Sequence, residues 1–259
     1  MCGRFAITLP PDAVREYFRY VEQPNFPLRA NIAPTQPVPI VHAARDNGGQ
    51  VARHFRLMRW GFLPSFVKDP KDYPLVINAR SETAAEKASF RNALRRRRCL
   101  FLADGFYEWQ RAGGKALRPF LIRRQDRLPL GMAGLWETWI GPDGEEIDTV
   151  CVLTTASNGV MSAVHDRMPV LLEQGQFDLW LSPDERDTQD ATQMMRPAAE
   201  DVLDLIEIGP AVNKVSNDGL WIQEPVDPLA PRTDAPAPKR VAKPKPDTSS
   251  SAPKSFGSI

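Results

Sequence analysis

Residues 99–109 read CLFLADGFYEW, and this stretch decides the expected fold class. Apolar and aromatic residues dominate it, and Asp104 and Gly105 interrupt it, which is typical of two strands joined by a turn. The stretches 119–139 and 148–157, which follow along the chain, have the same character. The sequence therefore predicts strands and hairpins through the middle of the chain.

The N-terminal part mixes a helix with extended segments. Residues 10–21 predict a helix that begins at a proline. Its apolar face comprises Val14, Tyr17, Phe18 and Val21. Three prolines make residues 31–41 an extended or edge segment, and residues 53–63 alternate as a strand does.

Residues 76–98 pass from a strand into a second helix, with a capping box formed by Thr83 and Glu86. Four arginines, Arg95–Arg98, end this segment, where the helix dipole favours cations. Such a run fits a solvated helix end slightly better than a nucleic-acid site. Short helices are also expected over 176–182 and 191–206.

Irregular alternation of short strands and helices favours an α+β fold. We expect one domain over residues 1–226, with a largely antiparallel, barrel-like β-sheet and flanking short helices. Residues 227–259 are rich in Pro, Lys and Ser and hold almost no large apolar side chain. They predict a disordered C-terminal tail, because they cannot bury enough apolar surface to fold.

Composition narrows the classes of function. No apolar run reaches the roughly 18–20 residues of a membrane span, and no signal peptide is recognisable, so a cytoplasmic protein is expected. The net charge of +1 requires any nucleic-acid contact to come from a local cluster. Cys2, Cys99 and Cys151 lack metal-site spacing, so no metal, cofactor or disulfide is expected. Cys99 and Cys151 lie in apolar runs, whereas Cys2 stands outside one.

Several polar residues occur in unusual surroundings. Asn78 and Arg80 follow a strand, and His165 precedes an apolar one. Glu108 lies between two aromatic residues, where desolvation should raise its pKa and suit it to act as an acid. Each residue taken singly fits a structural role as well as a functional one.

Nine stretches in order carry a resemblance to a known family: MCGRF, NIAPTQPVPIV, RWGFLPS, INARSET, RRCLFLADGFYEW, GLWETW, TTASN, HDRMPVLL and VNKVSNDG. Over roughly residues 2–225 the chain resembles the SOS response-associated peptidase family, which comprises abasic-site processing proteins of DNA repair. One departure is visible, because a tryptophan is expected near Phe66.

The resemblance implies that loss of Met1 exposes Cys2, which then links covalently to an abasic site in single-stranded DNA. Roughly a tenth of an α-amine is neutral at pH 7, so it can attack the sugar aldehyde and form an imine. The adjacent thiol then closes a thiazolidine ring, since both groups are held on neighbouring carbons. Ring closure removes the imine that would otherwise lead to strand cleavage.

Roles for other residues follow from the same resemblance. Asn78 should hold the amine or the sugar, Glu108 should act as general acid and base, and His165 should contact the sugar hydroxyl. The expected DNA contacts are Arg4, Pro34, Trp60, Gly61, Arg80, Thr154 and Arg167. Among them, the arginines should bind phosphates, and Trp60 and Pro34 should stack on or wedge between bases. A monomer acting at damaged DNA is expected.

Alternatives remain open. Glutamine amidotransferases with an N-terminal nucleophile also begin Met-Cys-Gly, but this chain lacks their Arg-Gly-Pro-Asp and His-x-Arg-x-x-Thr stretches. A non-covalent single-stranded DNA-binding module would tolerate loss of Cys2, Glu108 and His165. The family resemblance also points to a peptidase, hydrolase or lyase class. Proteolysis is expected to be self-removal of Met1 at most, and reversal of the crosslink stays open.

Overall fold

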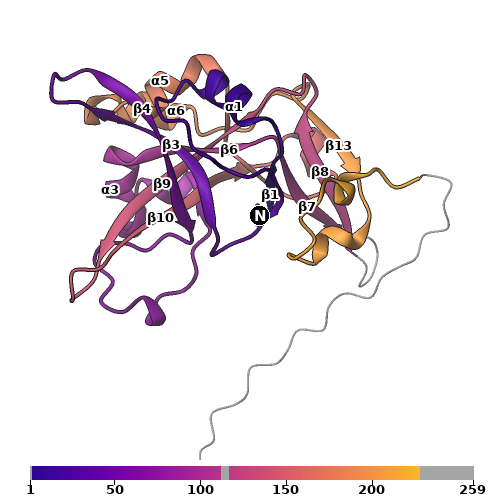
Figure 1. Ribbon diagram of the computed structural model, residues 1–259, viewed down its shortest axis with the longest axis horizontal. Helices are drawn as coiled ribbons and strands as arrows, with labels where there is room; N and C mark the ends of the chain where they lie inside the picture. The colour runs from indigo at the N-terminus through magenta and orange to yellow at the C-terminus, as the bar shows by residue number, and fades with distance from the viewer. Residues whose placement is uncertain (1, 112–116, 228–259) are drawn as a thin grey trace, which may run out of the picture.

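The computed structural model describes residues 2–111 and 117–227, which form two β-sheets flanked by short helices (Figure 1). The smaller sheet has five strands, and its pairings are antiparallel. In spatial order they are β13 (Leu203–Glu207), β8 (Leu117–Arg124), β7 (Gly105–Arg111), β1 (Phe5–Ile7) and β2 (Arg29–Ile32).

The larger sheet has eight strands and closes on itself. Its main path is β11 (Arg167–Pro169), β10 (Glu146–Ala156), β4 (Val51–Trp60), β3 (Pro37–Arg45), β6 (Arg98–Ala103), β9 (Leu130–Ile140) and β12 (Leu171–Leu172). Because β9 also pairs with β10, the strands β10, β4, β3, β6 and β9 form a closed barrel. A short strand, β5 (Asn78–Arg80), joins β10 in parallel, as β4 does. The predicted α+β fold with a largely antiparallel, barrel-like sheet is thus confirmed.

Short helices cover the outside of the sheets. The α-helices are α1 (Pro11–Phe18), α2 (Ser81–Ala84), α3 (Ala88–Arg96), α4 (Gly159–Ser162), α5 (Phe177–Leu181) and α6 (Thr188–Gln193). The 3₁₀ turns are η1 (Pro70–Asp72), η2 (Gln174–Gln176), η3 (Glu185–Asp187), η4 (Pro210–Asn213) and η5 (Leu220–Gln223). Figure 1 shows α1, α5 and α6 grouped at one end of the barrel. Within the described residues, no helix is long and apolar enough to cross a membrane.

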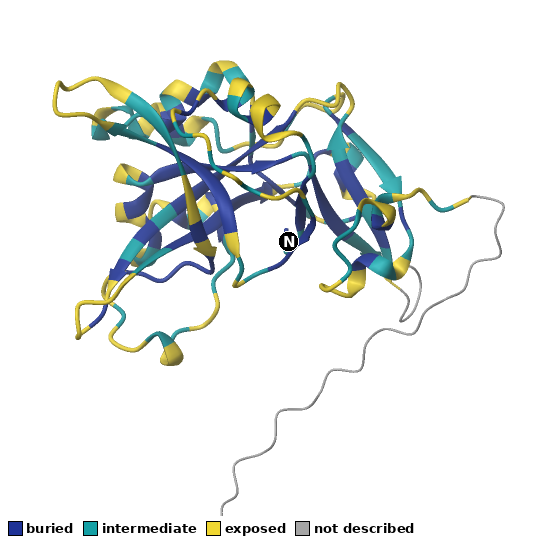
Figure 2. Cartoon of the chain, viewed as in Figure 1, coloured by how far each residue is buried: buried dark blue, intermediate teal, exposed yellow. Residues whose placement is uncertain are grey.

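The apolar core runs through the barrel and reaches the first residues of the chain. Phe5 packs edge-on against Trp60 of β4 and Phe101 of β6, with ring centroids 5.3 and 6.0 Å apart. Figure 2 shows the strands mostly buried and the outer loops and helix faces exposed. This packing fixes β1, and with it the residues around Cys2, at the junction of the two sheets.

Three local expectations are wrong. The first helix ends at Phe18, because Arg19 adopts a left-handed conformation, with φ of 56°, and the chain turns away. Thr83 lies inside α2 and makes no capping bond, and the next helix starts afresh at Ala88. The last part of the expected helix 191–206 instead forms β13, which pairs along its length with β8.

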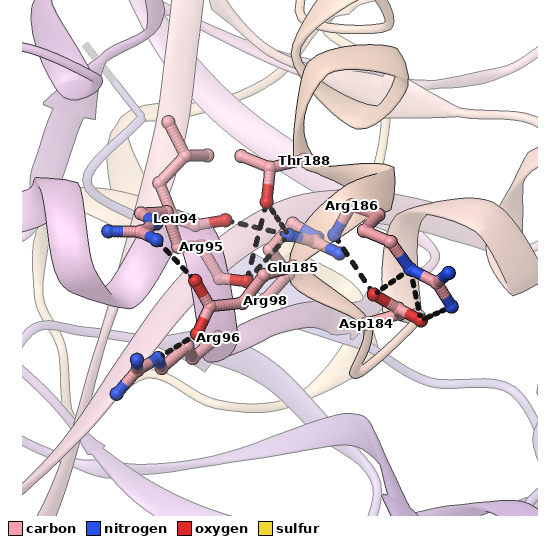
Figure 3. A network of polar contacts seen from close by, with 8 residues as sticks. All are labelled: Leu94, Arg95, Arg96, Arg98, Asp184, Glu185, Arg186 and Thr188. Atoms are coloured by element: carbon pink, nitrogen blue, oxygen red, sulfur yellow. Dashed lines mark hydrogen bonds and ion pairs between the residues drawn. The ribbon is translucent and has the colours of Figure 1, made fainter.

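The arginine run ends α3 and enters β6. Arg95 and Arg96 both form ion pairs with Glu185, as a solvated helix end would (Figure 3). Arg98 is buried instead, contrary to expectation, and donates to the carbonyls of Trp180 and Ser182, both at 2.6 Å. These arginines therefore stabilise the fold. The expected tail, residues 227–259, lies outside the described residues apart from its first residue.

Candidate active site

Cys2 lies beside two strands, β7 and β5, that carry polar residues. β1 pairs antiparallel with β7, and the amide of Tyr107 continues this pairing by donating to the carbonyl of Arg4 at 2.9 Å. The next residue of β7, Glu108, is thereby brought beside the start of the chain. From the other side, Asn78 at the beginning of β5 donates from Nδ2 to the carbonyl of Cys2 at 2.9 Å. Asn78 and Glu108 therefore both lie beside Cys2.

Cys2 itself is completely buried and belongs to the apolar core. This corrects the expectation that Cys2, unlike Cys99 and Cys151, stands outside an apolar setting; all three are buried. Burial, reinforced by the nearby charge of Glu108, raises the pKa of the Cys2 thiol. The thiol is consequently protonated at neutral pH, and any reaction of it as a nucleophile requires a base.

Glu108 is a candidate for that base. Only 3% of its surface is exposed, and desolvation raises the pKa of its carboxyl group, while the charge of His165 partly offsets the shift. The effect of desolvation matches the sequence-based expectation. A raised pKa makes the carboxyl group a better match for proton transfer in both directions, as a general acid and as a general base.

His165 lies in the segment between α4 and β11. Its Nδ1 accepts a hydrogen bond from the backbone amide of Arg167 at 3.0 Å and lies 2.9 Å from Oδ1 of Asp166. The two contacts require different protonation states, because Nδ1 must carry a lone pair for the first and a proton for the second. A ring without a proton on Nδ1 accepts from the Arg167 amide, whereas a ring with a proton on Nδ1 donates to Asp166.

Arg80, Thr154 and Arg167 lie together where β5 and β11 flank β10. Arg80 pairs in register with Thr154, is exposed, and makes no side-chain contact within the described residues. Arg167 donates to both carboxylate oxygens of Glu82, at 2.6 and 2.9 Å, and to the carbonyl of Thr154. Arg80 is therefore the arginine best exposed for a phosphate, while Arg167 is held by protein acceptors.

Arg4 lies two residues after Cys2, just before β1. Its Nη1 donates to Asn31 Oδ1 at 2.7 Å and to the carbonyl of Val212 at 2.9 Å, and its guanidinium lies 5.9 Å from the ring centre of Trp109. Partial burial lowers the pKa of Arg4. Half-buried Pro34 sits in the turn between β2 and β3. The contacts of Arg4 and Pro34 do not assign either residue a role in catalysis.

Trp60 and Gly61 differ from expectation. Trp60 is completely buried, and its indole N–H donates to the carbonyl of Ile77 at 2.9 Å, so no ring face is available to a base. The Gly61 amide donates to the Val150 carbonyl, so it is engaged within the fold. Glycine is required there, because φ is +148° and a Cβ would meet the side chain of Leu75 at 2.6 Å.

Phe66, near which a tryptophan was expected, is a further candidate for contact with DNA. The ring is 60% exposed, in the loop between β4 and β5. An isolated bridge between Phe62 and Val76 closes the base of this loop, two residues before Asn78. The signal for Phe66 is its exposure, since a large aromatic side chain on such a loop lacks a packing role.

The described residues contain no cluster of His, Cys, Asp and Glu that could hold a metal ion. They do contain a buried acceptor, Asn78 Oδ1, that finds no hydrogen-bond partner among them. Because its Nδ2 is anchored on Cys2, this oxygen is held near the start of the chain. It can accept a hydrogen bond from an incoming donor.

The barrel brings the carboxyl group of Glu108 and the side-chain amide of Asn78 next to Cys2 at the start of the chain. This arrangement occurs in a chain that matches one protein family. The model of the family described as SOS response associated peptidase (SRAP) matches residues 1–215, and the chain belongs to this family. It is 34% identical over 221 residues to abasic site processing protein YoqW of Bacillus subtilis, covering 84% of this chain and 96% of YoqW. It is 32% identical over 238 residues to abasic site processing protein HMCES of Xenopus tropicalis, covering 76% and 70%.

Solved structures agree with the fold. A crystal structure of a protein from Bacteroides thetaiotaomicron superimposes with a TM-score of 0.75 at 22% identity, covering 87% of this chain and all of the other. A protein from Bordetella bronchiseptica gives a TM-score of 0.67 at 28% identity, covering 80% of this chain and all of the other.

Proposed function

We propose that this chain processes abasic sites in single-stranded DNA by forming a covalent thiazolidine crosslink through Cys2. The observation that carries the proposal is the buried carboxyl of Glu108 beside the Cys2 thiol, both with raised pKa values. Relatives that bear the name abasic site processing protein support the substrate. Met1, which lies outside the described residues, must be removed first to free the α-amine.

The first step is attack of the α-amine on the C1′ aldehyde of the opened sugar. Asn78 Oδ1 accepts a hydrogen bond from the amine and so directs its lone pair at the carbon. The carbinolamine then loses its hydroxyl as water. Neutral Glu108 donates the proton that this water needs, which leaves a protonated imine and a carboxylate.

The second step closes the ring. The Glu108 carboxylate takes the proton of the Cys2 thiol as the sulfur bonds to the imine carbon, and the C=N electron pair returns to nitrogen. Glu108 is thus neutral again, and the sum is amine, thiol and aldehyde giving a thiazolidine and one water. A buried thiol with a raised pKa needs this internal base, because free thiolate is scarce.

His165 and several surface residues contact the DNA. The Nε2–H of neutral His165 donates to the sugar hydroxyl that ring opening frees. Arg80 binds a phosphate beside the lesion, and Phe66 stacks on a neighbouring base. Arg4, Pro34, Thr154 and Arg167 shape the rim. Proteolysis is confined to removal of Met1, and reversal of the crosslink uses the same proton transfers in the opposite order.

The test uses a single-stranded oligonucleotide with one abasic site, with denaturing gels as the readout. The wild-type protein is expected to give a stable slow-migrating band. Cys2→Ser retains the amine but closes the ring poorly, so it should instead cleave the strand through the imine and be trapped only by borohydride. A wild-type protein that binds the oligonucleotide without any covalent band would favour a plain DNA-binding module.

A further inference from the structure

Glu82 forms an ion pair with the guanidinium of Arg167 at the rim of the candidate site. Nη1 donates to Oε1 at 2.6 Å and Nη2 to Oε2 at 2.9 Å, so the pair is bidentate. Only 15% of the Arg167 side chain is exposed, and Nη2 also donates to the Thr154 carbonyl at 2.5 Å. Glu82 belongs to α2 and Arg167 begins β11, so the contact ties two distant segments to β10.

The main chain of the same arginine faces the candidate catalytic histidine. The Arg167 amide donates to His165 Nδ1 at 3.0 Å. This donation requires the lone pair on Nδ1 and therefore favours the neutral tautomer with its proton on Nε2 over the tautomer in which Nδ1–H donates to Asp166. Charged groups among the described residues that act on the ring include Asp166, which contacts Nδ1, and Glu108, which interacts with it electrostatically. Pairing of Arg167 with Ala156 of β10 holds the main chain there, and the contact between Glu82 and the guanidinium adds a second hold on the same residue.

We propose that Glu82 is a positioning residue for His165, acting through Arg167. The carboxylate fixes the guanidinium, the guanidinium fixes the start of β11, and the amide there fixes the imidazole. The catalytic role of His165 rests on the proposed function, whereas the tautomer of its ring can be measured in the free protein without DNA. In the alternative role, Glu82 occupies the position of a DNA phosphate on Arg167, and a bound phosphate displaces Glu82 from the guanidinium.

The first test reads the tautomer directly by long-range ¹H–¹⁵N spectra of the imidazole rings at alkaline pH. The chain has three histidines, so the His165 signals can be assigned with a His165→Ala variant. The wild-type ring is expected as the Nε2–H tautomer, and Glu82→Gln as a mixture of both. Glu86→Gln is the matched control, because Glu86 is exposed nearby and makes no side-chain contact within the described residues. Thermal melting of each variant checks that it is folded.

The second test separates positioning from phosphate competition. For Glu82→Gln, the single-turnover rate of crosslinking at saturating DNA should fall roughly tenfold, with an altered pH profile and an unchanged salt dependence of DNA binding. An unchanged tautomer, or tighter binding with a steeper salt dependence and an unchanged rate, would overturn the inference. Failure of the proposed function looks different, because the wild-type protein would then form no adduct at all.

Discussion

Asn78 donates a hydrogen bond from Nδ2 to the main-chain carbonyl of Cys2 over 2.9 Å. The other end of the same amide, Oδ1, is buried and finds no partner among the described residues. An amide anchored at one end in this way presents its acceptor in a fixed direction. Asn78 is therefore suited to orient an amine on Cys2, and its contribution can be measured separately from that of the acid and base.

Replacing Asn78 by alanine should slow crosslinking without preventing it. Loss of one neutral hydrogen bond in the reacting complex corresponds to about a tenfold lower single-turnover rate. Quenched time points on denaturing gels measure this rate. Asn25→Ala, which alters an exposed asparagine, is the control and should react like the wild type. An Asn78→Ala protein that reacts at the wild-type rate would contradict the assigned role.

Glu108→Gln should be more stable than the wild type at neutral pH. Desolvation raises the pKa of Glu108 above its ordinary value of 4.5, so the folded state binds the proton more tightly than the unfolded state does. Wild-type stability therefore falls as the pH rises from 4.5 through the folded-state pKa, whereas the glutamine has no such dependence. Thermal melts from about pH 4 to about pH 8 should show the variant's advantage growing with pH and vanishing at the acid end.

The same Glu108→Gln protein should lose most of its crosslinking. A general acid and base typically contributes about 100-fold or more to a rate, so the single-turnover rate should fall by at least that factor. Gain of stability together with loss of rate identifies a residue kept for chemistry and not for folding. If the variant were less stable at neutral pH, the carboxylate would instead be a structural partner.

Phe66→Ala should weaken binding to abasic single-stranded DNA, while Phe66→Trp should preserve it. Stacking of one base on an aromatic side chain is worth about 1–3 kcal/mol, which corresponds to a loss of roughly 5- to 150-fold in affinity. Fluorescence anisotropy on a Cys2→Ala background, with a tetrahydrofuran analogue of the abasic site that carries no aldehyde, measures binding without covalent reaction. Val21→Ala removes another exposed apolar side chain and should leave the affinity unchanged.

Arg80→Ala and Arg96→Ala should differ in the salt dependence of binding. Arg80 is exposed without a contact in the described part of the chain, whereas Arg96 is paired with Glu185. Each phosphate contact on a single strand contributes about 0.7 to the slope of log affinity against log salt. The slope should become shallower by about that amount in Arg80→Ala and remain unchanged in Arg96→Ala.

The strand-rich middle of the chain was predictable because its apolar and aromatic runs are broken by Asp, Gly and Pro. The raised pKa of Glu108 followed from its neighbours, Tyr107 and Trp109, on one strand. Both predictions depend on residues close in sequence. Helix ends were less predictable, because the left-handed Arg19 and the pairing of β13 with β8 are set by tertiary packing.

The surroundings of Cys2 and Trp60 could not be read from local sequence. Cys2 is buried because Phe5 packs against Trp60 and Phe101, two residues from distant strands. The same packing removes Trp60 from the surface, whereas Phe66 presents an exposed aromatic ring. The ion pair between Glu82 and Arg167 likewise joins residues 85 positions apart, and the spacing of the motifs does not predict it.

Intact mass spectrometry tests the central claim most directly. The purified protein is weighed before and after incubation with a single-stranded oligonucleotide that carries one abasic site, alongside Cys2→Ala. Crosslinking through Cys2 predicts a protein lacking Met1, then an adduct that survives denaturation and equals protein plus oligonucleotide minus one water, absent in Cys2→Ala. A protein that loses Met1 and stays unmodified, or an adduct that persists in Cys2→Ala, would contradict crosslinking through Cys2.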